Sequence, residues 1–328
     1  MEEQKNNGDP SVPDGKPLMT MEVEQSPLLL EGDDKLTLGR VLGMLGTALL
    51  VVLLPLSVTV AVGIFQMVRP DKVVSTRTPK DLGLAYEDVR LKTDDGIDVA
   101  AWYVPAETPS GSSVLALHGY PTDKGDILPR VAFLAKKYDL LLIDFRSFGE
   151  SGGTYTTLGP KELADAQAGI AWLRAKGAKK IGVYGFSMGG AVGLMTLGGH
   201  PSPDAVAAEA AYADLWQVME EPYKYLGPLK RACAWMTALA ARAILGIDVD
   251  RASPAAAVAD TKKPVLLIHS KNDKVVPFSH AELLKERLKD DPLAETWFTD
   301  NEGHGEPSTD FPAHVQDFFD RNLIPANP

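Results

Sequence analysis

Residues 181–193 read IGVYGFSMGGAVG. Residues 181–184 form a continuous apolar run, typical of a strand buried on both faces of a parallel sheet, and small residues from Gly190 onward favour a helix start. Ser187 lies between them, with glycine two residues away on either side. In a strand, tight turn and helix the neighbouring backbones approach too closely for side chains, so both places need glycine. The stretch predicts a strained turn that holds Ser187 out at the edge of a sheet.

Strands and helices alternate on both sides of this stretch. The other expected strands are residues 113–117, 140–143, 206–211, 265–268 and 295–299, and the clearest helices are residues 161–176 and 281–288. Residues 86–91 and 98–104 instead alternate apolar with polar around the turn TDDG at 93–96, which predicts an antiparallel hairpin. The alternation of strand and helix predicts an α/β fold with a mostly parallel sheet.

The N-terminal region contains a long run without charge. Residues 41–68 comprise 28 residues and no Asp, Glu, Lys or Arg, whereas about 20 apolar residues suffice to span the hydrocarbon core of a bilayer. We predict a single uncleaved transmembrane anchor at 37–69, which contacts the lipid bilayer through residues 41–68. A cleaved signal peptide is the alternative, but its apolar region would be shorter, and QMVRP at 66–70 is no small-residue cleavage site.

The segments that flank this run differ in charge. Residues 1–36 carry nine Asp or Glu against three Lys and have little apolar patterning, which predicts a disordered acidic tail. Residues 70–82 are expected to be a linker. Basic residues near the run are Lys35 and Arg40 before it, and Arg69, Lys72, Arg77 and Lys80 after it. The excess after the run favours, weakly, a cytoplasmic C-terminal domain on a single-pass membrane protein.

The remaining composition is that of a globular protein. The chain has 328 residues, 45% of them hydrophobic and 23% charged, with a formal net charge of -11. It contains no basic cluster that could neutralise a run of phosphates, so we exclude nucleic-acid binding. Cys233 is the only cysteine, which excludes an intrachain disulfide and a multi-cysteine metal site. We expect it to be a small buried apolar residue.

Two residues downstream of Ser187 are suited to activate it. A serine hydroxyl is a weak nucleophile unless a base removes its proton, and the base needs a carboxylate to orient it. Asp273 is the best carboxylate candidate because it follows the apolar run 265–268. His304 is the best base candidate because it follows the last expected strand and has glycine on both sides. The chain order serine, acid, histidine is one of three known orders for a catalytic triad.

A tetrahedral intermediate also needs donors for its oxygen. His118-Gly119-Tyr120 follows the apolar run 113–117, which would bring a backbone amide to that oxygen. We assign the backbone amides of Tyr120 and Met188 to an oxyanion hole. His118 itself is expected to be a structural hydrogen-bonding residue. The remaining expectations are solvated or capping roles for His200, His280 and His314, and a satisfied core position for His269.

Five motifs together are similar to those of the α/β-hydrolase superfamily. They are LHGY at 117–120, DFRSFGES at 144–151, GFSMGG at 185–190, ND at 272–273 and GH at 303–304. Residues 83–325 resemble its serine-aminopeptidase-like and monoacylglycerol-lipase-like branch. The resemblance implies an eight-stranded, mostly parallel sheet with helices on both faces, the triad Ser187, Asp273 and His304, and the same two oxyanion amides. One departure is Ser147, where relatives often carry glycine.

An aromatic insert at 213–250 interrupts the alternation of strands and helices. It is either a helical lid that forms an apolar acyl pocket and contacts the bilayer, or a pair of ordinary core-facing helices. With an apolar lid and a membrane anchor, we expect carboxyl esters of lipid-like or medium-length acids to be cleaved through an acyl-enzyme on Ser187. A small ester or lipid is then the substrate, and no metal or cofactor is needed.

Two other functions stay open. In a serine peptidase or amidase of aminopeptidase type, Asp214, Glu220 and Glu221 would bind the amino terminus of the substrate. A noncatalytic binding module is also compatible with the fold, because a fold does not determine function. The presence of all three residues of the expected triad favours an enzyme over a binding module.

Overall fold

The computed structural model describes residues 37–247, 249, 253–300, 303–306 and 308–324. The expected acidic tail at 1–36 therefore lies outside the described residues. The chain divides into two compact units, Met1–Leu53 and Leu54–Pro328. In the first unit, the described residues form the beginning of helix α1 (Leu38–Val68), and the second unit contains the rest of this helix and all later elements.

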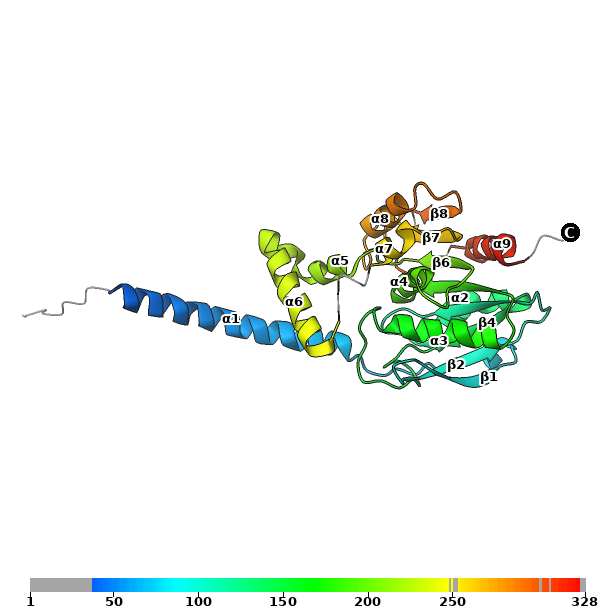
Figure 1. Ribbon diagram of the computed structural model, residues 1–328, viewed down its shortest axis with the longest axis horizontal. Coiled ribbons are helices and arrows are strands. Elements are labelled where there is room, and N and C mark those ends of the chain that lie inside the picture. The colour runs from blue at the N-terminus through cyan, green and yellow to red at the C-terminus, as the bar shows by residue number, and fades with distance from the viewer. Residues whose placement is uncertain (1–36, 248, 250–252, 301–302, 307, 325–328) are drawn as a thin grey trace, which may run out of the picture. The chain divides into compact units, whose positions relative to one another are not determined.

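Helix α1 has 31 residues and a mean hydropathy of 2.6 over its most apolar window (Figure 1). At about 1.5 Å per residue it extends over roughly 46 Å, whereas the hydrocarbon core of a bilayer is about 30 Å thick. By length and composition it is a candidate membrane-spanning helix. It begins three residues before the expected apolar run and ends with that run, at Val68.

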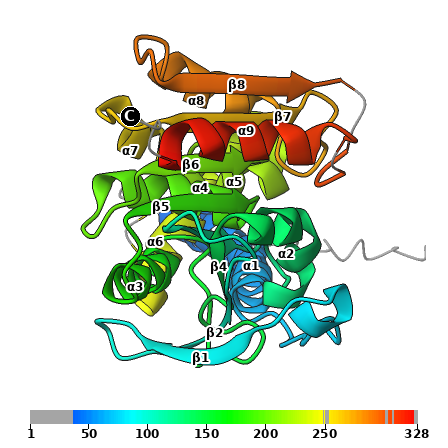
Figure 2. The same cartoon turned by 90° about the vertical axis from the view of Figure 1, so that its right-hand side faces the viewer.

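The second unit is built on a sheet of eight strands in the order β1-β2-β4-β3-β5-β6-β7-β8, seen from β8 at the top to β1 at the bottom of Figure 2. The strands are β1 Glu87–Lys92, β2 Asp98–Val104, β3 Ser112–Leu117, β4 Asp139–Ile143, β5 Lys180–Phe186, β6 Ala205–Glu209, β7 Val265–Ser270 and β8 Ala294–Thr299. Strand β2 pairs antiparallel with β1 and β4, and the other pairings are parallel. The predicted hairpin and the predicted mostly parallel sheet are both confirmed.

Helices cover both faces of this sheet, as expected. One core contains side chains of α3 and α4, with α7 and α8, and the other contains side chains of α2 and α9. The bounds are α2 Lys124–Val131, α3 Glu162–Ala175, α4 Met188–Met195, α7 Pro254–Ala259, α8 Ser279–Arg287 and α9 Phe311–Leu323. The strand expected at 206–211 ends earlier, at Glu209, because Ala210 adopts a left-handed backbone with φ 52°. The parallel strands could be predicted from the sequence because strands buried on both faces have continuous apolar runs.

The insert between β6 and α7 is helical. It contains α5 (Leu215–Glu220), a 3₁₀ segment η4 (Glu221–Leu229) and α6 (Lys230–Leu245). Helix α6 buries Cys233, as expected for this residue, but exposes Trp235 and Leu239 on another face. One side of α6 thus packs as a core helix, and another presents apolar side chains to the surroundings.

Ser147, where the resemblance implies glycine, is buried in the loop after β4. Its backbone has φ 69°, a left-handed conformation that glycine adopts without strain and serine does not. Its buried hydroxyl has no hydrogen-bond partner among the described residues. The neighbouring Arg146 is held by Asp165 at 2.7 Å, so the loop conformation is imposed from outside Ser147. Serine at this position is therefore locally unfavourable.

Ser147→Gly is expected to stabilise the protein. It removes the left-handed strain and a buried unpaired hydroxyl, and the greater freedom of glycine in the unfolded chain offsets part of the gain. We expect a net increase of about 1 kcal/mol in the free energy of unfolding, seen as a rise of about 2–4 °C in Tm by scanning calorimetry. Ser147→Ala, which keeps the β-carbon, should gain less, and a Tm that is lower in Ser147→Gly than in wild type would contradict this account.

Candidate active site

Ser187 lies at the turn between β5 and α4. Its backbone has φ 55° and ψ −116°, a strained conformation for a residue with a side chain. A β-carbon at Gly185 would overlap the carbonyl group of Gly189, and one at Gly189 would overlap the carbonyl of Leu117. The backbone packing therefore requires glycine at both positions, and it leaves the Ser187 side chain at the surface of the turn.

The structure brings the three predicted residues of the triad together. His304 Nε2 lies 3.2 Å from Ser187 Oγ, and His304 Nδ1 lies 2.7 Å from Asp273 Oδ2. Asp273 is 5% exposed and Ser187 is 9% exposed, so this chain of hydrogen bonds is largely shielded from solvent. The three residues come from the ends of β5 and β7 and from the segment after β8, all at the carboxyl edge of the parallel strands.

Asp273 is held as a carboxylate by several donors. Burial acts to raise the pKa of this carboxyl, but hydrogen bonds from His304 and from the backbone outweigh it and lower the pKa below its ordinary value of 3.8. The backbone donors are the N–H groups of Val275 and Val276, at 2.8 and 2.9 Å from Asp273 Oδ1. Because Oδ1 is occupied by these amides, Oδ2 remains directed at the imidazole of His304.

Arg130 and Glu209 support this arrangement and were not anticipated from the sequence. Glu209 accepts two hydrogen bonds of 2.8 Å from Arg130 Nη1, and its backbone oxygen accepts the Ser187 N–H at 2.8 Å. Arg130 Nη2 in turn donates to the carbonyl oxygen of Gly305, next to His304. The ring of Phe186 contacts both Arg130 and His304, with its centroid 4.4 Å from the Arg130 guanidinium and 5.0 Å from the ring of His304. One buried ion pair thus contacts both the serine turn and the histidine loop.

The loop after β3 packs directly against the nucleophile. A β-carbon placed on Gly119 would lie 3.2 Å from Cβ of Ser187. His118 is buried, and burial lowers the pKa of its imidazole, which keeps the ring neutral. Its Nε2 accepts the Phe145 N–H at 2.9 Å, so Nδ1 carries the proton and donates to the Gly119 carbonyl at 2.7 Å. His118 is a structural residue, as expected, and it fixes the loop beside Ser187.

Tyr120 and Met188 follow these two backbone turns. Both residues line the cavity that contains Ser187. In the part of the chain that the structure describes, neither backbone N–H donates a hydrogen bond to another protein group. For Met188 this is expected, because the first N–H groups of a helix have no partner within it. Two amides beside the nucleophile are therefore available to a ligand oxygen.

The cavity at Ser187 is mostly apolar and has a volume of about 590 Å³. Its walls include Tyr120, Met188, Tyr212, Val218, Val275 and Val276. A second cavity of about 350 Å³ shares Met67, Leu158 and Val218 with it and is lined almost entirely by aliphatic side chains. Such volumes are typical of sites for small organic ligands, which occupy about 300–1,000 Å³.

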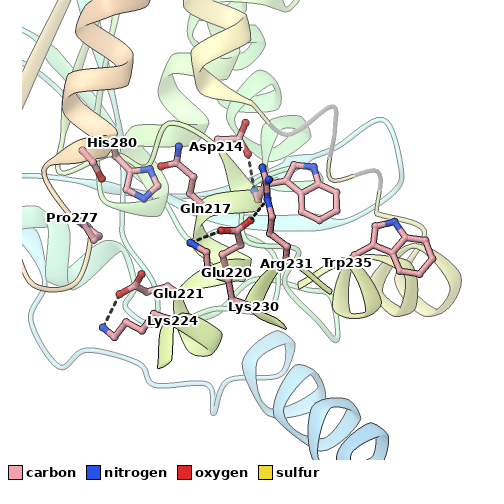
Figure 3. Close-up of a pocket in the computed structure, with 12 residues that line it drawn as sticks. Asp214, Gln217, Glu220, Glu221, Lys224, Lys230, Arg231, Trp235, Pro277 and His280 are labelled. Carbon is pink, nitrogen blue, oxygen red and sulfur yellow. Dashed lines mark hydrogen bonds and ion pairs between the residues drawn. The ribbon is translucent and has the colours of Figure 1, made fainter. Parts of the chain in front are cut away.

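A third cavity, of about 830 Å³, is lined mostly by polar and charged residues (Figure 3). It shares Glu221 and His280 with the cavity at Ser187. Its two glutamates are ion-paired: Glu221 lies 2.7 Å from Lys224, and Glu220 lies 3.0 Å from Lys230. The carboxylate of Asp214 accepts the N–H of Trp216 at 2.7 Å and so caps α5. The three acids considered for binding an amino terminus are all engaged by protein groups.

The remaining histidines differ in their environments. The expectation of a solvated or capping role is wrong for His280, which is buried and accepts the Ala213 N–H through Nδ1. Burial, with a smaller effect of His269, lowers the pKa of His280 to about 4. His269 is a buried residue that contacts the Val276 carbonyl, as expected, while His200 and His314 are exposed.

Several known proteins are similar to this chain. Residues 98–243 match the profile of the X-Pro dipeptidyl-peptidase (S15) family. The solved structure of the esterase Pf2001 of Pyrococcus furiosus is similar with a TM-score of 0.65 and 30% sequence identity, over 78% of this chain and 100% of that chain. Two curated relatives are the uncharacterized protein YqkD of Bacillus subtilis, 30% identical over 59% of this chain, and the protein Bem46 of Schizosaccharomyces pombe, 26% identical over 61%. The chain spans a little under two thirds of the length of these two, 65% and 64%.

Sequence, fold and similarity point to one family. The fold of the chain is similar to that of the esterase Pf2001, at a TM-score of 0.65, and to that of an acylaminoacyl peptidase of Pyrococcus horikoshii, at a TM-score of 0.57 and 19% identity. The match to Pf2001 extends over the whole of that esterase. The chain belongs to the α/β-hydrolase superfamily.

Proposed function

We propose that this protein is a membrane-anchored serine hydrolase that cleaves carboxyl esters of apolar acids through an acyl-enzyme on Ser187. The observation that carries the proposal is the hydrogen-bonded chain Ser187–His304–Asp273, which opens into an apolar cavity. Similarity to a solved esterase that is matched along its whole length supports the same reaction class.

In the proposed mechanism His304 is the general base. Its Nδ1–H donates to the ionised Asp273, which leaves Nε2 free to take the proton from Ser187 Oγ. The hydroxyl oxygen attacks the ester carbonyl, and the proton passes from His304 to the departing alcohol. His304 then takes a proton from a water molecule whose oxygen attacks the acyl carbonyl, and the bond to Ser187 Oγ breaks as His304 returns the proton to that oxygen and the acid is released. The carboxylate of Asp273 stabilises the imidazolium in both steps because its pKa is lowered and it stays charged.

The amides of Tyr120 and Met188 are the proposed oxyanion hole. They flank Ser187 from two backbone segments that the glycine contacts hold close together. Donors of this kind lower the barrier by roughly 3 kcal/mol each, because they bind the oxygen more strongly once it is negatively charged. Only backbone atoms are involved, so side-chain substitution at either residue should act through packing.

The ion pairs of the glutamates that line the polar cavity favour an ester over a peptide substrate. An aminopeptidase needs a carboxylate for the ammonium group of its substrate, but Glu220 and Glu221 are both held by lysines. The cavity at Ser187 offers apolar walls that suit an acyl chain. The match to the X-Pro dipeptidyl-peptidase family supports an amide substrate as the second candidate.

The insert is the proposed second point of membrane contact. Helix α6 exposes Trp235, Leu239 and Ile244, at 59%, 52% and 71%. Large exposed apolar side chains of this kind are characteristic of interaction or membrane surfaces. Together with α1 they support an enzyme that works at a bilayer. The basic residues after α1 favour the cytoplasmic side for the catalytic unit.

The mechanism predicts that a fluorophosphonate probe labels Ser187. Ser187→Ala should abolish labelling and hydrolysis, and Asp273→Asn should lower kcat by on the order of 10⁴-fold because the imidazole loses its orienting carboxylate. The assay is a panel of nitrophenyl esters and aminoacyl amides, with the labelled residue located by mass spectrometry. Labelling elsewhere, or turnover that survives Ser187→Ala, would refute the mechanism, and faster cleavage of amides would favour the peptidase.

Arg130→Ala is expected to lower kcat for nitrophenyl esters by about 10- to 100-fold with little change in KM. Its guanidinium holds the backbone beside His304 and does not touch the cavity at Ser187. Loss of one buried partner also destabilises the fold, so Tm is measured in parallel. Arg174→Ala, which removes an ion pair with Asp204 in a different part of the sheet, is the matched control. If both variants lose kcat equally, Arg130 has no specific positioning role.

The proposed orientation is tested by adding a protease to intact cells that express the full chain. A cytoplasmic catalytic unit should be protected until the cells are permeabilised. Cleavage of that unit in intact cells would reverse the assigned orientation.

A further inference from the structure

We propose that the last turns of α1 form part of the substrate site, so that a long acyl chain extends from Ser187 into a cavity walled by the anchor helix itself. This inference rests on the proposed ester hydrolysis at Ser187 and adds the substrate class, which is esters of long-chain acids. All residues involved belong to the unit Leu54–Pro328.

The first step is that two cavities adjoin each other. The cavity at Ser187 and the aliphatic cavity have three residues in common, and each comes from a different part of the chain: Met67 from α1, Leu158 from the loop before α3, and Val218 from α5. Residues that line both spaces form the boundary between them. An acyl chain that extends from Ser187 past these three side chains would enter the aliphatic cavity.

The second step is the chemistry of the aliphatic cavity. Helix α1 contributes Val60, Ile64, Met67 and Val68, and the insert contributes most of the other walls. The hydroxyl groups in the lining are engaged with protein groups, since Tyr223 and Thr237 lie 2.7 Å apart and Thr237 donates to the Cys233 carbonyl at 3.0 Å. Thr157 likewise donates to Glu162 at 2.6 Å. A space with aliphatic walls and satisfied hydroxyls suits a hydrocarbon chain and no polar ligand.

The third step is the attachment of α1. The carbonyl oxygen of Val68 accepts the N–H of Thr156 at 2.8 Å, and Val68 is only 8% exposed. Lys72 donates to the carbonyl of Ser151 shortly afterwards. Leu158 is held in turn by a 2.6 Å hydrogen bond from the Tyr212 hydroxyl to its carbonyl. The end of α1 and the boundary residue Leu158 are thus fixed on the domain, as the wall of a binding site must be.

The size of the second cavity gives the expected selectivity. At about 350 Å³ it is large enough to be a ligand site by itself, so the acyl chain is not limited to the space at Ser187. Each further methylene that is buried strengthens binding roughly fourfold. We expect kcat/KM to rise with acyl length well beyond short acids.

The test compares Ile64→Trp with Val62→Trp in the full chain, reconstituted in lipid nanodiscs. Ile64 lines the aliphatic cavity, whereas Val62 is 49% exposed two residues earlier on the same helix and does not line it. The substrates are nitrophenyl esters from acetate to palmitate. We expect Ile64→Trp to lower kcat/KM for palmitate at least tenfold, while acetate hydrolysis changes less than twofold and Val62→Trp leaves both unchanged.

A chain-length profile that is the same in wild type, Ile64→Trp and Val62→Trp overturns the proposal. If Ile64→Trp fails to fold, Ile64→Ala replaces it, and the enlarged cavity should shift the preferred acyl length upward, with an unshifted preference again overturning it. Failure of the proposed function is distinguishable, because the wild-type enzyme would then hydrolyse neither acetate nor palmitate esters and Ser187 would not be labelled.

Discussion

The ion pair between Arg130 and Glu209 connects the parts of the candidate active site that lie far apart in the sequence. Glu209 is the last residue of β6, so its backbone oxygen is positioned by the sheet to accept the Ser187 N–H. Its carboxylate holds Arg130, and Arg130 holds the backbone beside His304. The pair is largely buried, where replacing one partner leaves an uncompensated charge. Glu209 therefore contacts the serine turn through its backbone and the histidine loop through its ion pair with Arg130.

The strained serine turn is the other constraint, and it explains what could be predicted. The close packing of backbones at Gly185 and Gly189 produces a short sequence motif with glycine at both positions, because no other residue fits there. Continuous apolar runs are equally visible in the sequence, and they predict strands that are buried on both faces of a parallel sheet. Asp273 and His304 were found because the carboxyl ends of parallel strands meet at one edge. The glycine and strand predictions rest on rules that act over a few residues, and the geometry of a parallel sheet then relates the ends of strands that lie far apart in the sequence.

What could not be predicted depends on contacts between distant segments. Arg130 and Glu209 are 79 residues apart, and neither has neighbours that indicate a partner. His280 was misjudged because its position near a helix end suggested solvent, whereas packing against Ala213 buries it. The boundaries of the cavities combine α1, a loop and the insert, which no local pattern brings together. Ser147 could be predicted only in part, because the sequence shows that it replaces an expected glycine but not that its backbone is left-handed.

Helix α1 is longer than the hydrocarbon core of a bilayer requires, and its end is attached to the catalytic unit at Val68. Residues 60–68 provide the cavity wall and its attachment, which leaves 22 of the 31 residues of the helix. At about 1.5 Å per residue these 22 extend over roughly 33 Å, close to the hydrocarbon thickness of about 30 Å. In the proposed membrane-bound enzyme, these 22 residues are long enough to span the hydrocarbon core, and residues 60–68 are not needed for it. A bilayer of different thickness would then act on the helix segment that walls the acyl cavity, because mismatch is relieved by tilting the helix or by drawing more of it into the lipid.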